Sequence, residues 1–176
     1  IAIINAAPTI PTAPTIGTIT TPTCANPTGS VILNGLPINC IITKTPGGET
    51  YSATGSNYTV TNLTTGTYTF TVSNGTCSSS ASSNVVINAA PSVTAPIVGL
   101  MIQPTCSVAT GSVTLSGLPS GNWTLTRLPS NINFTSTGLN TTISGLTTGI
   151  YNYTVTDANG CIDTISVFIN EPSPLS

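Results

Sequence analysis

Apolar and hydroxyl-bearing residues alternate along two stretches of nearly the same sequence, residues 63–77 and residues 146–161. In the first stretch Tyr68, Phe70 and Val72 are separated by threonines, and the second stretch repeats this alternation. A period of two residues is the pattern of a β-strand with one buried face. An Asn-Gly pair follows in each copy and supplies the positive φ that a tight hairpin turn needs. Each copy therefore predicts a strand, a tight turn and a cysteine.

Other apolar runs stand at matching places around these two stretches. They predict strands at residues 15–21, 30–33, 40–45 and 85–88 in the first half of the chain, and at residues 97–103, 112–116, 123–128 and 167–170 in the second. Residues 49–62 and their counterparts, residues 132–145, fit either one long kinked strand or a hairpin of two strands. Proline, glycine and β-branched residues recur too often for helical periodicity. The sequence therefore predicts an all-β chain.

The internal repeat divides the chain into two domains. We expect one antiparallel β-sandwich over residues 8–90 and a second over residues 91–173, with residues 174–176 starting a further linker. A segment rich in proline and threonine leads into each domain. Such segments favour stiff, extended connections over flexible ones.

Residues 1–7 resemble the last strands of both repeats, but no domain body stands before them in the sequence. We therefore expect Ile1, Ile3 and Ile4 to lie in a strand that pairs outside residues 14–172, because a free apolar strand would be an exposed edge. In one alternative the strand is the tail of a preceding repeat, so that the chain is a processed product or a piece of a longer one. In the other it is donated to a neighbouring chain.

The apolar faces of the alternating strands give the expected core. The expected members are Val31, Leu33, Ile42, Leu63, Tyr68, Phe70 and Val72 in the first repeat, and Val113, Leu115, Trp123, Leu125, Leu146, Tyr151, Tyr153 and Val155 in the second. The single tryptophan is most simply a core residue, although a surface tryptophan that stacks on a sugar is the functional alternative.

Charge is almost absent from the chain. Charged residues make up 3% of the sequence and the net charge is −2, whereas an average soluble domain is about 25% charged. One lysine and one arginine cannot form a basic patch, which excludes nucleic acid and a polybasic membrane anchor as partners. No run of about 18 apolar residues exists, which argues against membrane insertion.

The residues that enzymes use are missing or isolated. The chain has no histidine, so it lacks the ordinary general base near neutral pH. No zinc spacing or phosphate-binding loop appears, and we expect no catalytic residue, metal or cofactor. Asp157 and Asp163 suggest a calcium site, but Asn74 and Ser79 replace them in the first repeat. This favours the simpler interpretation, in which one aspartate belongs to a turn and the other is solvated. A lysine–asparagine crosslink is disfavoured because Arg127 replaces the only lysine, Lys44.

Four of the five cysteines occupy matching places in the two repeats. Cys24 and Cys77 correspond to Cys106 and Cys161, and Cys40 has no counterpart. We expect disulfides Cys24–Cys77 and Cys106–Cys161 and a free Cys40 in the first core, as in an oxidising, extracellular setting. Both partners reach the same end of a sandwich only if residues 49–62 form one kinked strand. A separate pair of strands would place them at opposite ends.

The second repeat carries its motifs in a distinctive order: Pro-Thr-Cys, Thr-Gly-Ser-Val, Gly-Leu-Pro, Gly-Leu-Thr-Thr-Gly-Ile-Tyr and Thr-Val-Thr-Asp-Ala-Asn-Gly-Cys, between Pro104 and Pro172. This order resembles the SprB-type and related Ig-like tandem repeats of very large Bacteroidota cell-surface proteins. Residues 22–91 are a second copy, which departs from the pattern with Cys40 in the place of Trp123. The resemblance implies two tandem Ig-like antiparallel β-sandwich domains.

The same resemblance implies a function outside the cell. Such repeats build the stalks of surface adhesins exported by the type IX system, and no catalytic residues are known for them. The leading hypothesis is thus a structural module of a bacterial cell-surface stalk or secreted filament, whose partners are neighbouring copies of the repeat. The alternative is a carbohydrate- or surface-binding module that uses exposed aromatics such as Tyr51, Tyr58 and Phe134. Thr164, in an Asp-Thr-Ile motif, is a candidate O-glycosylation site.

Overall fold

The computed structural model describes residues 7–171, and those residues contain strands but no helix. The chain divides into two compact units, Ile1–Ala90 (unit 1) and Pro91–Ser176 (unit 2). The strands of unit 1 are β1 (Thr15–Thr20), β2 (Gly29–Asn34), β3 (Cys40–Thr45), β4 (Thr50–Ala53), β5 (Asn57–Leu63), β6 (Gly66–Ser73) and β7 (Val85–Ile87). Those of unit 2 are β8 (Ile97–Ile102), β9 (Gly111–Ser116), β10 (Trp123–Leu128), β11 (Ile132–Ser136), β12 (Asn140–Leu146), β13 (Gly149–Asp157) and β14 (Ile162–Ile169).

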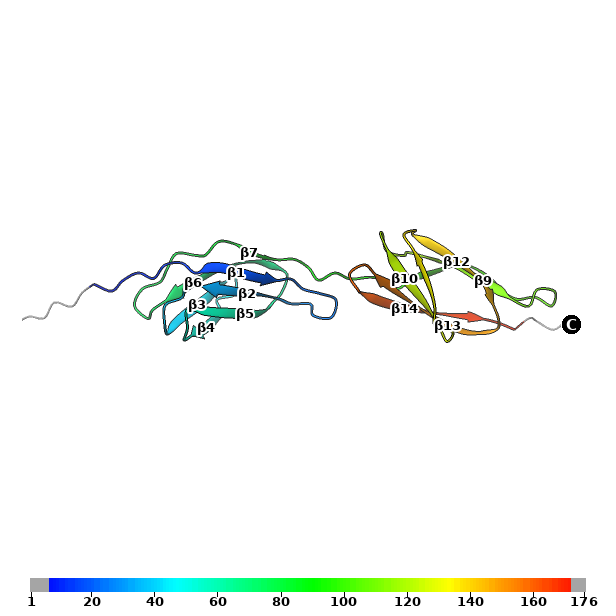
Figure 1. The fold of residues 1–176 in the computed structure, drawn as a ribbon, viewed down its shortest axis with the longest axis horizontal. Coiled ribbons are helices and arrows are strands. Elements are labelled where there is room, and N and C mark those ends of the chain that lie inside the picture. The colour runs from blue at the N-terminus through cyan, green and yellow to red at the C-terminus, as the bar shows by residue number, and fades with distance from the viewer. Residues whose placement is uncertain (1–6, 172–176) are drawn as a thin grey trace, which may run out of the picture. The chain divides into compact units, whose positions relative to one another are not determined.

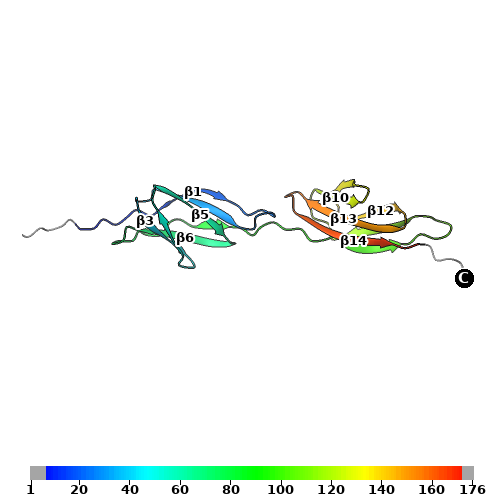
Figure 2. The ribbon, with the colours of Figure 1, turned by 90° about the horizontal axis from the view of Figure 1, so that it is seen from below.

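Each unit is a sandwich of two antiparallel sheets (Figures 1 and 2). In unit 1 the sheet β1-β2-β5 lies against the sheet β4-β3-β6-β7, and in unit 2 the sheet β12-β9-β8 lies against the sheet β11-β10-β13-β14. The inner strands alternate buried and half-buried residues, as in β2 and β9, because successive side chains point to opposite faces of a strand. The predicted fold class, two tandem Ig-like antiparallel β-sandwich domains, is confirmed.

Residues 49–62 form two strands that do not pair with each other. Strand β4 pairs with β3 in one sheet, and β5 pairs with β2 in the other sheet, so the chain crosses between the sheets after Ala53. Residues 132–145 repeat this arrangement, because β11 pairs with β10 and β12 with β9. Within residues 7–171 each unit therefore has seven strands, and this number decides at which end of the sandwich each cysteine lies.

The cores follow the predicted faces closely. Of the expected core residues, all are buried except Tyr151, which is half-buried and packs against the core of unit 2. The buried residues that were not expected come mainly from the loops, the crossing strands and the last strands: Leu36, Ala53, Val60, Val85, Ile87, Leu118, Ile143, Val167 and Ile169. The free thiol of Cys40 is also buried in the core of unit 1, as predicted.

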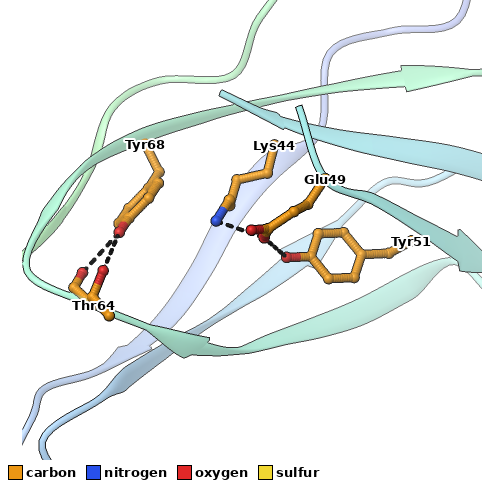
Figure 3. Close-up of polar contacts among 5 residues, drawn as sticks. All are labelled: Lys44, Glu49, Tyr51, Thr64 and Tyr68. Atoms are coloured by element: carbon orange, nitrogen blue, oxygen red, sulfur yellow. Dashed lines mark hydrogen bonds and ion pairs between the residues drawn. The ribbon is translucent and has the colours of Figure 1, made fainter. Parts of the chain in front are cut away.

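A tyrosine at the start of the sixth strand ties back to the preceding turn in both units. The hydroxyl of Tyr68 donates to the carbonyl oxygen of Thr64 at 2.9 Å (Figure 3), and that of Tyr151 donates to the carbonyl oxygen of Thr147 at 3.0 Å. This bond is the tyrosine corner found in Ig-like sandwiches. It accounts for the Leu-Thr-Thr-Gly-x-Tyr sequence that both repeats share.

The edge beside the sixth strand differs between the units. In unit 2, β14 pairs with β13 along its full length. In unit 1, β7 pairs with only the first three residues of β6. Two buried serines accept hydrogen bonds from the backbone farther along β6. The backbone N–H groups of Val72 and Phe70 donate to the hydroxyls of Ser79 and Ser82, both at 3.0 Å. The serines thus satisfy donors that a regular strand would satisfy with carbonyl groups.

The glycine of the Thr-Gly-Ser-Val motif begins the second strand where two backbones approach closely. A Cβ atom on Gly29 would lie 2.7 Å from the carbonyl oxygen of Thr20, and one on Gly111 would overlap the carbonyl oxygen of Ile102. We expect Gly111→Ala to lower the free energy of unfolding by about 1–3 kcal/mol, because the backbone must move to admit the methyl group. Gly29→Ala should act in the same direction.

Gly55→Ala is the matched control, because a Cβ atom there meets nothing closer than 3.9 Å. Urea unfolding of the full chain compares the three variants. A loss for Gly55→Ala as large as for Gly111→Ala would show that the cost does not come from the close approach.

Candidate functional site

The four matched cysteines lie at the ends of the two sandwiches. We call the end where a unit's first strand begins its proximal end, and the end where its last strand finishes its distal end. Cys24 follows β1 and therefore lies at the distal end of unit 1. Five strands, β2 to β6, separate it from Cys77. Because consecutive strands run in opposite directions, Cys77 lies at the proximal end.

Unit 2 repeats this placement. Cys106 follows β8 at the distal end, and Cys161 lies in the turn between β13 and β14 at the proximal end. The loop between β1 and β2 carries Cys24, and the loop between β8 and β9 carries Cys106. An eight-residue strand such as β6 spans about 25 Å, whereas the Cα atoms of a disulfide lie within about 7 Å of each other.

The expected pairings within each repeat are therefore wrong. Cys77 is a free, half-buried thiol, while Cys24 and Cys161 are the disulfide-bonded cysteines. The predicted pairs Cys24–Cys77 and Cys106–Cys161 would each have to cross the whole length of a sandwich. The error arose because residues 49–62 contribute two strands instead of one, which changes the number of strands between the cysteines from even to odd.

The same hydrogen-bonded turn presents the proximal cysteine in both units. In unit 2, Asp157 Oδ1 accepts from the backbone N–H of Cys161 at 2.8 Å. In unit 1, Asn74 Oδ1 accepts from the backbone N–H of Cys77 at 2.9 Å. Asp157 thus acts in a turn, and its replacement by Asn74 keeps the acceptor and removes only the charge.

The turn that carries Cys77 is also tied to the segment that leads into unit 1. The side-chain amide of Asn74 donates to the carbonyl oxygen of Thr9 at 3.0 Å, and the Cys77 thiol lies 4.0 Å from the carbonyl oxygen of Pro8. These contacts hold the thiol beside the incoming chain.

A second cluster surrounds the single lysine toward the distal end of unit 1, where β3 ends and β6 begins. The ammonium of Lys44 lies 2.6 Å from a carboxylate oxygen of Glu49 and 5.1 Å from the ring centroid of Tyr68. The hydroxyl of Tyr51 donates to Glu49 at 3.1 Å, as Figure 3 shows. The hydrogen bond between Lys44 and Glu49 raises the pKa of the amine and lowers that of the carboxyl group, while burial raises the pKa of Tyr51.

Unit 2 places an arginine where unit 1 has Lys44. The Arg127 guanidinium lies 5.9 Å from the ring centroid of Phe134 and 5.7 Å from that of Tyr151. Each repeat thus sets its one basic residue against aromatic rings, and such contacts contribute about 0.5–1 kcal/mol at exposed sites. Glu49 neutralises the charge of Lys44, whereas aromatic rings cover the guanidinium of Arg127.

The aromatic residues do not gather on an exposed face. Trp123 is 3% exposed, and its indole nitrogen donates to the carbonyl oxygen of Gly138 at 2.8 Å. The three candidate contact residues Tyr51, Tyr58 and Phe134 are half-buried against the two cores. A groove of about 340 Å³ runs beside Trp123, but the buried ring cannot offer its face to a sugar.

Within residues 7–171, no three histidine, cysteine, aspartate or glutamate residues come together in a group that could hold a metal ion. The same residues include no helix that could span a membrane.

The remaining predicted site residues have different outcomes. Thr164 is exposed on the edge strand β14, and its hydroxyl lies 2.9 Å from that of Thr154, so its glycosylation stays a prediction. Ile1, Ile3 and Ile4, expected to pair as a donated or preceding strand, lie outside the described residues.

No protein-family model matches the chain, and no curated protein matches it. A solved structure of the FN1-FN3 domains of chicken CNTN1 is similar at 13% sequence identity, with a TM-score of 0.37, over 92% of this chain and 69% of that one.

Proposed function

We propose that the chain is a structural repeat module of an extracellular stalk or filament, of the kind that carries a bacterial cell-surface adhesin. The observation that carries this proposal is the repetition of one Ig-like sandwich that presents no cluster of exposed aromatic residues within residues 7–171. Phe70, Trp123 and Tyr153 are buried in the two cores. The resemblance of the motif order to SprB-type repeats supplies the bacterial setting, and the disulfide agrees with an oxidising compartment.

The partners in this proposal are neighbouring copies of the same repeat. Each unit already fills its last-strand position with its own segment, since β7 pairs with β6 and β14 with β13. This favours repeats joined in one polypeptide. Assembly of separate chains by strand complementation through Ile1, Ile3 and Ile4 is the second form of the proposal.

Force spectroscopy on the full chain, held by its two termini under reducing conditions, tests the mechanical role. We expect two discrete unfolding events, each lengthening the chain by about 3.3–3.6 Å per residue of one sandwich. Extension at low force without discrete events would overturn the proposal.

A glycan array with the folded chain tests the alternative, a carbohydrate-binding module. We expect no binding, because no exposed aromatic cluster is available. Binding of one glycan class, lost on changing residues around the groove such as Asn122 or Ser136 without loss of stability, would favour the alternative.

A further inference from the structure

The two repeats place a basic residue at the same position but surround it differently. In unit 1, Glu49 stands opposite Lys44, because its carbonyl oxygen accepts from the Lys44 backbone N–H at 2.8 Å. In unit 2 the cross-strand partner of Arg127 is Ile132, and directly opposed residues share one face of a sheet. Unit 2 therefore has an alkyl side chain at the place from which unit 1 neutralises its basic residue.

The guanidinium of Arg127 has no counter-ion within unit 2. The carboxylate-bearing residues of this unit are Asp157, Asp163 and Glu171. Within residues 7–171 none of them forms an ion pair with Arg127. Nε donates to Ser130 Oγ at 3.0 Å, and the two Nη atoms make no hydrogen bond to the described residues. Because Arg127 is half-buried, its charge is partly desolvated as well as unpaired.

The aromatic contacts of Arg127 leave its hydrogen-bond donors unused. The guanidinium lies 5.9 Å from the ring centroid of Phe134 and 5.7 Å from that of Tyr151. These contacts restrict the side chain but consume none of its N–H groups. A guanidinium can donate two parallel hydrogen bonds to one carboxylate, and such bidentate pairs are the strong ones. Arg127 is therefore preorganised for a carboxylate that its own unit does not supply.

A second polar group beside Arg127 also lacks an acceptor. Tyr153 stands opposite Arg127 in the register of β10 and β13, and its buried hydroxyl has no hydrogen-bond partner among the described residues. In unit 1 the residue opposite Lys44 is Phe70. Unit 2 thus has two donor groups here and no carboxylate, whereas unit 1 has the carboxylate of Glu49 and no hydroxyl at the matching place.

We propose that the guanidinium of Arg127 binds an acidic side chain of another polypeptide, whose carboxylate takes the place that Glu49 fills in unit 1. The arrangement in unit 1 argues for an aspartate or glutamate side chain as the ligand. There one glutamate carboxylate pairs with the basic residue and also accepts from the hydroxyl of Tyr51 at 3.1 Å (Figure 3). On a surface with so little charge, a single unpaired cation selects its partner by charge complementarity.

Solution NMR on the full chain tests this site through the side-chain Nε–H signal of Arg127. The chain has one arginine, so the signal is identified directly. The probes are N-acetylglutamate amide, its uncharged analogue N-acetylglutamine amide, and glucuronate, each titrated at constant ionic strength. We expect a saturable shift with the glutamate probe. The glutamine probe should bind at least about tenfold more weakly, because the charge-assisted hydrogen bonds are lost.

Ile132→Glu should close the site from within the unit, because it places a carboxylate opposite Arg127. Its affinity for the glutamate probe should fall at least about tenfold. The Arg127 signal of the free variant should also move in the direction that the probe causes in the parent. Ile132→Gln is the matched control, since it has the same length without the charge, and its affinity should stay within about twofold of the parent, as for most surface substitutions.

Equal affinity for the glutamate and glutamine probes would overturn the inference, and so would unchanged binding in Ile132→Glu. A preference for glucuronate over the glutamate probe would instead assign the site to an acidic sugar. Displacement of the probe by chloride at equal concentration would indicate a site for an adventitious ion only, and would equally refute the proposal. The inference does not depend on the structural role proposed above, which force spectroscopy tests separately.

Discussion

Trp123→Ala should lower the free energy of unfolding of unit 2 by about 3–5 kcal/mol, which is the usual cost of removing a large buried aromatic side chain. The indole is 3% exposed, so its removal opens a cavity between the two sheets. It also deletes the hydrogen bond to the carbonyl oxygen of Gly138. Hydrogen exchange measured by mass spectrometry on the full chain should show faster exchange in β10 and β13, and no change in unit 1.

Phe168→Ala is the matched control in the same unit. Phe168 is 56% exposed on β14, and most surface substitutions change stability by less than about 0.5 kcal/mol. A loss below about 1 kcal/mol for Trp123→Ala, joined to weaker glycan binding, would contradict the structural role of the tryptophan and favour a binding module.

The second large effect is a loss of stability in alkali. Tyr153 is fully buried and its hydroxyl has no hydrogen-bond partner among the described residues. Burial raises the pKa of Tyr153 to about 12, although the nearby Arg127 opposes the shift. The folded chain therefore keeps a proton that the unfolded chain loses near pH 10. The free energy of unfolding of unit 2 should be unaffected below that pH and fall by about 1.4 kcal/mol per pH unit between about 10 and 12.

Tyr153→Phe is the control. Unit 1 already has a phenylalanine, Phe70, at the matching place, so the sandwich accommodates this side chain. The variant should lose the alkaline slope. At neutral pH its stability should equal or exceed that of the parent, because a buried hydroxyl without a partner is destabilising. Urea unfolding followed by tryptophan fluorescence reports unit 2 alone, since Trp123 is the only tryptophan. An unchanged alkaline slope in the variant would rule out Tyr153 as its source.

The sequence predicted the fold well because the alternation of apolar and hydroxyl-bearing residues is uninterrupted in the inner strands. Val31 and Leu33, for example, were placed correctly on the buried face of β2. The same pattern could not predict the cysteine pairing. A strand that crosses to the opposite sheet and a strand that kinks have the same period, so the pairs β4/β5 and β11/β12 were left ambiguous.

Two other features left no usable signal in the sequence. Ser79 and Ser82 stand in a serine-rich stretch that reads as a loop, and only the structure shows that their hydroxyls accept from the backbone of β6. The alternation placed Tyr153 in the core, but nothing in the pattern indicated that its hydroxyl would lie there without a partner.

Unit 1 has Cys40 at the place where unit 2 has Trp123. Each unit therefore contains one buried residue whose exposure reports the unfolding of that unit. The Cys40 thiol is 1% exposed, and burial raises its pKa, so a thiol reagent reaches it only when unit 1 opens. Cys77 is only half-buried and reacts before Cys40. The slow phase of labelling therefore measures the opening equilibrium of unit 1 in native buffer, in the same unmodified chain whose tryptophan reports on unit 2.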